Sequence, residues 1–416
     1  IKFKMISYNK ALEILKKNKV NIKTEIILSK NSVNRICAKN VYSPNNFPAA
    51  NNTAFDGFAI NSKETKKINN NKGKKFKIIK IIAAGDNPRI KKIPNFSSIE
   101  VMTGAVIQRP FDTVIPIENI KYYPNKKNPN YIIVSNKIKK NNYIRFKGSD
   151  YKKGGRVITK GQVIQPNHIL ALKTLGIEKI LVKKKPKIVF YSTGNEISNN
   201  KKVPDWKIRN SNSHYLKSFL KSFPVEFKEK RILRDNDQEK FKKEIKINLI
   251  SNTDIVVTSG AVSAGKYDFV PKIISNFKLK NFFKGVAIRP GKPIMFACFK
   301  NKMAFFGLPG NPISSAACFR FFLLPFLNSS MGTIENIPIV AKIKNNFLKK
   351  KNFTRFIKGR LRFSNKGKVE FKVYKGQESF RINPFTKSNA WGLFPSGKTI
   401  FKKGDYIKCY SFSEFK

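Results

Sequence analysis

The central part of the chain is built around Ser259-Gly-Ala-Val-Ser-Ala-Gly-Lys-Tyr-Asp268. The apolar run Asp254–Thr258 comes before it and is typical of a buried strand, and Tyr267–Phe277 follows with apolar residues at helical spacing. Gly260 and Gly265 permit positive φ, and the backbone N–H groups of a turn before a helix favour an anion. Because the carboxylate of Asp268 lies in the same turn, this stretch predicts a site for a phosphate ligand and a cation. An ordinary strand-to-helix turn is the alternative.

From residue 187 to residue 327 the sequence alternates between strand and helix patterns, which predicts a doubly wound α/β unit. The expected strands are Lys187–Tyr191, Val225–Leu233, Asp254–Thr258 and Gly285–Pro290, and a hairpin is expected over Pro293–Phe299 and Lys302–Phe306. The expected helices are Ser213–Phe223, Gln238–Ile250 and Ile313–Leu327.

Four strands of this unit end in loops rich in Gly or in acidic residues. These loops cover residues 192–196, 234–237, 259–268 and 307–312. In open α/β sheets ligands bind beyond the carboxyl ends of the strands. We therefore expect the four loops to converge on one crevice.

Three of the loops carry an acidic residue, namely Glu196, Asp235 and Asp268. Clustered carboxylates raise one another's pKa unless a cation relieves the repulsion, and Mg²⁺ prefers such oxygen ligands. Arg289 and Lys292 are expected to face the same crevice and to suit an anionic substrate. The alternative is that the acids are solvated loop residues.

The parts of the chain on either side of this unit differ from it in pattern. Tyr8–Lys17 predicts an amphipathic helix and Thr24–Leu28 a strand, and short apolar runs from Phe76 to Val134 predict a small all-β module. Within or beside that module, Asp56 precedes Gly57 and a strand, and Thr103 stands at a strand end. The tail from residue 337 to residue 416 predicts a second small β domain.

The composition is that of a globular protein with an unusual charge. The 416 residues include 84 basic and 25 acidic residues, a net charge of +59. The lysines are spread over the whole length, so compositional drift is favoured over nucleic-acid binding, although non-specific attraction to polyanions is expected. The four cysteines lack metal-ligand spacing and no uninterrupted apolar window of 18 residues exists, which favours a reducing, cytoplasmic setting without a membrane span.

Taken together, the motifs resemble one family, the molybdopterin molybdenumtransferases of the MoeA type, also seen as the E-domain of gephyrin. The matching stretches are Thr53–Ala59, Met102–Ala105, Gly148–Asp150, Ser192–Glu196, Arg234-Asp235, Ser259–Asp268, Arg289–Pro293 and Gly307–Pro312. They run in family order over nearly the whole chain.

The resemblance implies a multidomain fold of α/β and β parts. An elongated first domain is expected from residues 1–45 and 145–180, with a β-rich domain, 46–144, inserted into it. A central molybdopterin-binding three-layer α/β domain, 181–329, and a C-terminal β-barrel-like domain, 330–416, are expected to follow. It also implies a homodimer that takes adenylylated molybdopterin and molybdate as substrates, uses Mg²⁺ and releases AMP. A molybdopterin-adenylylating enzyme and molybdoenzyme maturation factors are possible partners.

The resemblance also assigns functional residues by position. The catalytic set is Asp56, Thr103, Glu196, Asp235 and Asp268, of which Glu196, Asp235 and Asp268 are the metal ligands. The substrate-binding set is Asp150, Ser192, Gly194, Ser259, Gly260, Ser263, Gly265, Arg289, Lys292, Pro309, Gly310, Asn311, Pro312 and Ser379.

Several positions depart from the family pattern. Asn195 and Asn210 stand where the family usually has Asp, and Ala261 and Glu378 stand where it usually has Gly. Two alternatives stay open from the sequence. One is a molybdopterin adenylyltransferase, and the other is a scaffold or polyanion-binding protein that kept the fold and lost the chemistry.

Overall fold

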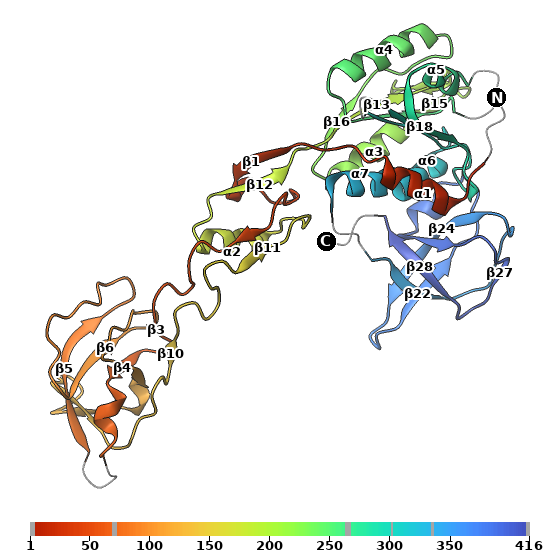
Figure 1. Cartoon of the computed structure of the whole chain (residues 1–416). Helices are drawn as coiled ribbons and strands as arrows, with labels where there is room; N and C mark the ends of the chain where they lie inside the picture. Colours follow the sequence, from red (N-terminus) through yellow and green to blue (C-terminus); the bar gives the residue numbers. More distant parts are fainter. Residues whose placement is uncertain (1–4, 69–72, 263–267, 301–302, 334–336, 413–416) are drawn as a thin grey trace.

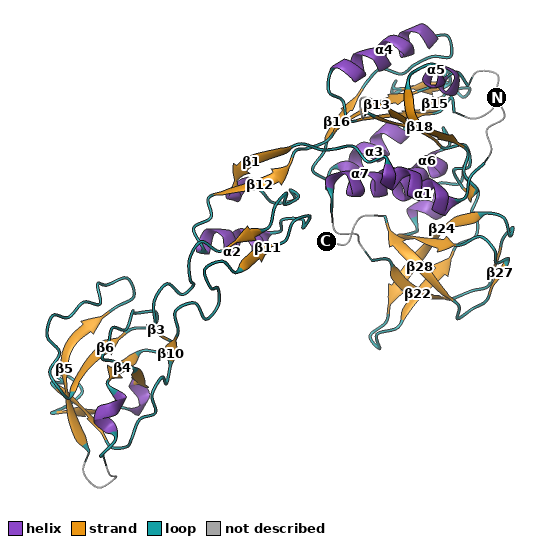
Figure 2. Cartoon of the chain, viewed as in Figure 1, coloured by secondary structure: helices purple, strands orange, loops and turns teal. Residues whose placement is uncertain are grey.

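A computed structural model describes residues 5–68, 73–262, 268–300, 303–333 and 337–412 of the chain. The molecule is elongated (Figure 1). A β domain lies at one end, the α/β domain and the C-terminal barrel lie together at the other, and a narrow segment connects them. Figure 2 shows that the larger helices gather in the α/β domain. None of the helices in these ranges is both long and apolar enough to cross a membrane.

The α/β domain is built on a six-stranded sheet with strand order β16-β13-β17-β21-β20-β18. The strands are β13 (Lys187–Ser192), β16 (Glu226–Glu229), β17 (Ile255–Ser259), β18 (Leu279–Lys284), β20 (Met295–Phe299) and β21 (Ala304–Leu308). The first four in this order are parallel, β20 runs antiparallel to β21, and the edge strand β18 runs antiparallel to β20. A short parallel pair, β14 (Ile197–Ser198) and β15 (Ile208–Arg209), follows the first strand.

The sheet is covered on both faces, so its strands are buried continuously rather than in alternation. One face packs on α3 (Asn212–Leu220), α6 (Pro312–Cys318), the π-helical segment η4 (Phe319–Leu323) and α7 (Leu324–Met331). The other packs on α4 (Gln238–Ile250) and α5 (Val270–Ser275). The expected three-layer α/β domain is confirmed.

Two expected elements of this domain differ in the structure. The strand expected at Gly285–Pro290 is wrong in position, because β18 occupies Leu279–Lys284 and only β19 (Ile288–Arg289) forms within the expected range, paired with the barrel. The helix expected at Ile313–Leu327 continues to Met331 but contains the π-helical segment η4. The start of the helix expected at Tyr267–Phe277 lies outside the described residues, and α5 begins at Val270.

The C-terminal domain is a closed barrel, as expected. Its strands are β22 (Ile339–Ile343), β24 (Thr354–Phe363), β25 (Val369–Val373), β26 (Ala390–Phe394) and β28 (Tyr406–Ser411), with the pair β23 (Phe347–Leu348) and β27 (Ile400–Phe401) and the short helix α8 (Asn383–Thr386) beside them. Pairing of β24 with β26 closes the ring. Trp391 of β26 is fully buried.

The inserted domain is a six-stranded sheet with order β7-β4-β6-β5-β9-β8. Its elements are β4 (Gly57–Ile60), η2 (Ser62–Thr65), β5 (Lys74–Ile82), β6 (Ser97–Val101), β7 (Thr113–Pro116), η3 (Ile117–Asn119), β8 (Lys121–Tyr123) and β9 (Tyr131–Val134). Apolar side chains form a separate core on each face of the sheet. The β-rich character expected from the sequence is confirmed.

Two chain segments far apart in sequence form the narrow connection. Its elements are β1 (Thr24–Leu28), η1 (Ser29–Asn31), β2 (Val41–Tyr42), β11 (Arg156–Ile158), α2 (Pro166–Thr174) and β12 (Lys179–Lys183). β1 pairs antiparallel with β12, and β2 pairs with β11. The pair β3 (Asn52–Thr53) and β10 (Ile144–Arg145) continues into the inserted domain.

An aromatic seam joins the N-terminal helix, the α/β domain and the barrel. Helix α1 (Tyr8–Lys17) begins at Ser7, whose hydroxyl accepts a hydrogen bond from the backbone N–H of Lys10. The ring of Tyr8 contacts Phe321, Phe322 and Phe356, and Phe321 stacks on Phe356 with ring centroids 3.9 Å apart. Since Phe321 belongs to η4 and Phe356 to β24, this seam holds two domains together.

Truncation of the seam should destabilise the protein strongly. We expect Phe321→Ala to lower the free energy of unfolding by about 3–5 kcal/mol, because a buried aromatic ring leaves a cavity. Urea denaturation measures this loss. Leu170→Ala, on an exposed position of α2, is the control and should change it by less than about 0.5 kcal/mol. Equal effects of the two changes would contradict the importance of the seam.

Candidate functional site

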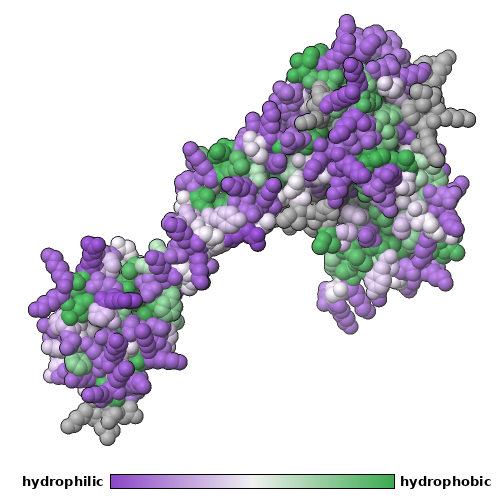
Figure 3. Space-filling view, viewed as in Figure 1, coloured by the Kyte–Doolittle hydropathy of each residue, from purple (hydrophilic) through white to green (hydrophobic). Residues whose placement is uncertain are grey.

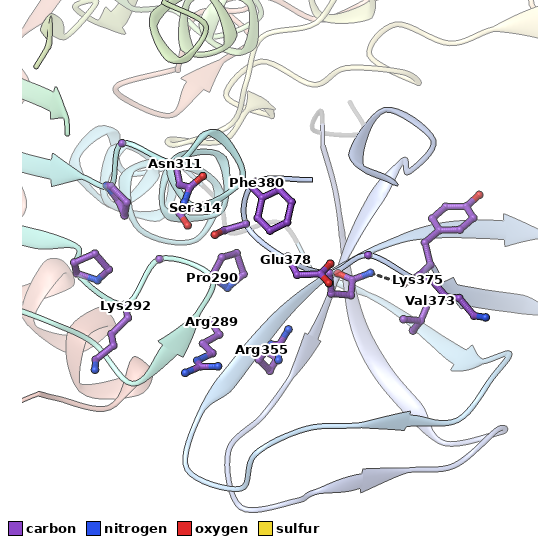
Figure 4. Close-up of a pocket in the computed structure, with 18 of the residues that line it drawn as sticks. Arg289, Pro290, Lys292, Asn311, Ser314, Arg355, Val373, Lys375, Glu378 and Phe380 are labelled. Carbon is purple, nitrogen blue, oxygen red and sulfur yellow. Dashed lines mark hydrogen bonds between the residues drawn. The ribbon is translucent and has the colours of Figure 1, made fainter. Parts of the chain in front are cut away.

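A cleft of about 1180 Å³ lies between the α/β domain and the barrel (Figure 4). The sequence-predicted residues that line it are Glu196, Gly260, Asp268, Arg289, Lys292, Pro309, Gly310, Asn311 and Ser379. The barrel contributes further lining residues that were not predicted, among them Phe347, Arg355 and Tyr374. The crevice expected beyond the strand ends is therefore closed on one side by the last domain.

The loop that carries Glu196 is held by backbone contacts on both sides. The N–H of Thr193 donates to Ser259 O at 2.9 Å, and the N–H of Gly194 donates to Leu233 O at 2.9 Å. Arg234 Nη1 donates to the carbonyl oxygens of Gly194, Asn195 and Ile197 at 2.9, 3.1 and 2.8 Å. Arg234 thus fixes the turn that presents Glu196, while Glu196 itself is exposed to the cleft.

Gly260 stands at a position that other residues do not fit. Its φ is 101°, and a Cβ there would lie 2.4 Å from Thr193 O. Its N–H donates to Leu308 O at 2.9 Å, so it connects three loop ends. Ala261 also takes a positive φ of 53°, a conformation that costs a non-glycine residue about 1–2 kcal/mol.

Two predicted substrate-binding serines, Ser192 and Ser259, are buried and form hydrogen bonds between loops. Ser259 Oγ accepts from Asn212 Nδ2 at 2.7 Å and donates to Pro309 O at 3.2 Å, and the same Asn212 amide donates to Gly310 O at 2.8 Å. Ser192 Oγ donates to Asn210 Oδ1 at 2.8 Å. Neither serine lines the cleft in the described part of the chain. Asn212 was not among the predicted residues, because its role depends on contacts between loops that are distant in sequence.

Two of the three predicted metal ligands line the cleft, and the third lies in a neighbouring loop. Glu196 and Asp268 both line the cleft. Asp235 lies beside them in the next loop, where its N–H donates to Asn195 Oδ1 at 3.2 Å, and it is not among the described lining residues. Within the described ranges no three His, Cys, Asp or Glu side chains form a group that would hold a metal by themselves. Ser263 and Gly265 lie outside those ranges.

Cationic groups share the cleft with the two carboxylates. Arg289 and Lys292 line the same cleft and are exposed to it. Partial burial lowers the pKa of Lys284, and the negative charge of Asp268 opposes this shift. An anionic ligand bound between these groups would meet opposite charges on several sides.

The loop that carries Ser379 forms four hydrogen bonds with Lys358 of strand β24. The Gln377 amide accepts from the Lys358 N–H at 2.9 Å and donates to Lys358 O at 2.8 Å, as a neighbouring strand would. Lys358 Nζ donates to Glu378 O at 3.1 Å and to Arg381 O at 3.0 Å. Lys358 is 1% exposed, and burial, aided by the charges of Arg381 and Arg355, lowers its pKa to about 8 against the opposing effect of Glu378.

Pro312 begins α6 directly after the cleft residue Asn311, whereas Asp56, Thr103 and Asp150 lie far from this cleft in the same chain. Asp56 and Thr103 meet in the inserted domain beside β3, where Asp56 Oδ1 accepts from the Thr103 N–H at 2.6 Å and from its Oγ1 at 2.7 Å. Asp150 lies in an exposed turn near the connection, with its N–H donating to Phe47 O at 3.1 Å. Figure 1 shows β4 and β6 at the opposite end of the molecule from β13 and β24.

Hydrophilic side chains are spread over the face of the molecule that Figure 3 shows. They occur over the inserted domain, the connection and the α/β domain alike, with smaller hydrophobic patches between them. This distribution agrees with the spread of lysines along the sequence.

Comparisons with known proteins agree with this arrangement. Sequence profiles match for the MoeA N-terminal region (domain I and II) over residues 6–176, for a probable molybdopterin binding domain over 190–329, and for the MoeA C-terminal region (domain IV) over 340–412. Proteins named molybdopterin molybdenumtransferase are similar to the chain. The one from Staphylococcus aureus is 29% identical over 380 residues, covering 90% of this chain and 88% of the relative. The one from Staphylococcus epidermidis is 28% identical over 406 residues, covering 97% and 94%.

A solved structure is similar over nearly the whole chain. The molybdopterin biosynthesis moeA protein from Pyrococcus horikoshii OT3 has a TM-score of 0.81 and 25% identity, and the match covers 98% of this chain and 99% of that one. Such a score requires that the domains be arranged alike along the chain. The sequence and fold similarities therefore point to the same family.

The contact between Asp56 and Thr103 predicts a measurable titration. The Thr103 side chain, and then its backbone N–H, lower the pKa of Asp56 by donating to the charged carboxylate. We expect Thr103→Val to raise the pKa of Asp56 toward its ordinary value, since only the N–H donor stays. Carboxyl-carbon NMR follows the titration. Asp405, whose pKa is lowered chiefly by Lys398, is the internal control, and an unchanged Asp56 titration would contradict the assigned contact.

Proposed function

This chain belongs to the molybdopterin molybdenumtransferase family of the MoeA type, and we propose that its cleft binds adenylylated molybdopterin and molybdate and releases AMP. The protein is an enzyme of molybdenum cofactor biosynthesis. To bind the adenylylated form of the substrate, the cleft must hold the negative charges of its phosphates.

The observation that supports the proposal is the grouping of opposite charges in one cleft. Glu196 and Asp268 come from loops at strand ends, and Arg289 and Lys292 lie in the turn beside them. Arg and Lys bind the negative charges of phosphate and molybdate, and carboxylates bind a cation that bridges to phosphate. The volume of about 1180 Å³ suits a ligand larger than a single nucleotide.

The carboxylates that the cleft offers fit Mg²⁺ with substrate as co-ligand. Mg²⁺ is usually held by one or two carboxylates together with substrate phosphates rather than by a complete protein cage. Glu196 and Asp268 would hold it, and the ion would supply positive charge at the phosphates. Asp235, with its backbone held by Asn195, supports the same loop pair. Arg289 and Lys292 orient the substrate independently of the ion.

The two alternatives drawn from the sequence are not favoured. Relatives that align over 90% or more of this chain are named molybdopterin molybdenumtransferase, and profiles of both the N-terminal and C-terminal MoeA regions match. A scaffold or an adenylyltransferase leaves these end regions without a role. Transient contact with an adenylylating enzyme and with maturation factors of molybdoenzymes, and a cytoplasmic location, are further parts of the proposal.

The proposal predicts loss of turnover when one cleft carboxylate is neutralised. We expect Asp268→Asn to lower AMP release by about a hundredfold or more, since loss of charge stabilisation of several kcal/mol has this effect on a rate. The assay supplies adenylylated molybdopterin, molybdate and Mg²⁺ and measures AMP. Glu239→Gln, on the exposed first turn of α4, is the control. Near-normal turnover of Asp268→Asn with unchanged melting temperature would refute the assignment.

We also propose that the site is completed by a second copy of the chain. Asp56 and Thr103 form a hydrogen-bonded pair on the inserted domain, far from the cleft of their own chain in the elongated molecule. A two-fold dimer creates two equivalent composite sites when one region of each subunit meets a different region of its partner. The exposed turn that carries Asp56 is a region suited to such a contact.

The dimer proposal predicts complementation between two inactive variants. Asp56→Asn and Asp268→Asn are mixed under conditions that exchange subunits. Random mixing should recover about a quarter of wild-type AMP release, because about half of the dimers are mixed and each of these has one intact site of two. Verified subunit exchange without any recovery would mean that Asp56 serves only its own chain.

A further inference from the structure

Two arginines stand directly opposite each other on the strands that join the α/β domain to the barrel. β19 pairs in parallel with β24, and the register places Arg289 beside Arg355. Both side chains line the cleft, and Figure 4 shows them next to each other below Glu378. Like charges directly opposite in a sheet are destabilising. The pair therefore calls for a compensating negative charge.

The protein does not supply that charge within the described residues. There neither guanidinium has a hydrogen-bond or ion-pair partner, and Arg355 Nε is buried without an acceptor. Each instead lies near an aromatic ring, with Arg289 Cζ 5.2 Å from the Phe353 centroid and Arg355 Cζ 6.0 Å from the Phe347 centroid. The rings help to orient the guanidinium planes and leave the N–H donors for a ligand.

Two lysines of the barrel, Lys349 and Lys358, add to the positive potential around Arg289 and Arg355. Lys349 Nζ donates to Phe353 O at 2.9 Å, and Lys358 Nζ is likewise held by backbone carbonyls, so neither charge is neutralised by these contacts. Burial, followed by the charge of Arg355, lowers the pKa of Lys349, and burial followed by Arg289 lowers the pKa of Arg355. Glu378, the acid that the barrel contributes to the cleft, lies 3.1 Å from Arg381 Nε through its Oε2.

We propose that Arg289 and Arg355 form a subsite for a doubly charged tetrahedral oxyanion at the junction of β19 and β24. Two guanidinium groups on adjacent strands can each donate two N–H groups to one phosphoryl or oxyanion group. Arg355 thereby becomes a specificity-determining residue that the barrel adds to the cleft. The phosphate of a nucleotide and a free oxyanion offer the same chemistry. Naming a nucleotide phosphate and free molybdate as the two candidate ligands rests on the proposed function, whereas binding of an oxyanion by the two arginines does not.

The proposal is tested by anion binding to the full chain. Calorimetry at low salt measures the affinity of AMP, inorganic phosphate and molybdate for the wild type, Arg289→Gln, Arg355→Gln and the control Arg360→Gln, which lies on the same strand but is exposed outside the cleft. Loss of a charged hydrogen-bond donor should weaken binding about ten- to hundredfold in the first two variants. The control should stay within about twofold.

The three ligands distinguish the two sources of the oxyanion. A loss confined to AMP identifies the nucleotide phosphate as the occupant, and a loss for phosphate and molybdate identifies a free oxyanion. A double variant that loses no more than either single variant shows that both arginines hold one group. Binding of all three ligands within twofold of wild type in Arg355→Gln would overturn the subsite and leave a solvated cation pair.

A stability measurement tests the electrostatic argument without turnover. Arg355→Glu places a carboxylate opposite Arg289, so the ligand-free protein should melt about 2–4 °C higher, and phosphate should no longer raise its melting temperature. A phosphate-induced rise equal to that of the wild type would also overturn the proposal. Wild-type protein that binds these anions through Arg355 but releases no AMP would retain the subsite and refute the proposed reaction.

Discussion

Stacking of Phe321 on Phe356 holds the barrel against the α/β domain, and the cleft depends on that contact. The two rings come from η4 and β24, and Tyr8 of the N-terminal helix packs on both. Arg355 precedes Phe356 on β24, so the seam also sets the position of the strand that pairs with β19. The apolar contact thus determines where charged groups from two domains meet. A site built in this way needs little reorganisation when a ligand enters.

Local pattern predicted the elements whose formation depends on neighbours in sequence. Helices at Tyr8–Lys17 and Gln238–Ile250 and the strand at Thr24–Leu28 form with the expected bounds, because periodicity and turn residues define them. The edge strand Leu279–Lys284 was missed, since its mixed apolar and polar residues do not give the continuous pattern of the central strands. The cleft acids, the Gly-rich turn and the Arg289–Lys292 turn were predictable from motifs.

The residues that sequence reasoning missed act through contacts made only in the folded chain. The Asn212 amide donates hydrogen bonds to Ser259 and Gly310 in two different loops. The Gln377 side chain forms hydrogen bonds with both backbone groups of Lys358, and Arg355 of the barrel lies opposite Arg289 of β19. The chain has 84 basic and only 25 acidic residues, so most basic side chains cannot pair with a carboxylate. Buried lysines such as Lys349 and Lys358 use backbone carbonyls instead. Asn210 similarly donates through its amide nitrogen to Glu229, a contact that an ionised carboxylate at this position could not make.

The narrow connection also constrains the order in which strands can pair while the protein is being synthesised. β1 cannot pair until β12 has left the ribosome, because Thr24 lies opposite Lys183 in the finished ladder. At about 5–20 residues per second, translation of the intervening chain takes on the order of 10 s. All strands of the inserted domain are made within that interval and pair only with one another or with nearby segments. The inserted domain can therefore form all of its strand pairs while β1 is still without its partner strand.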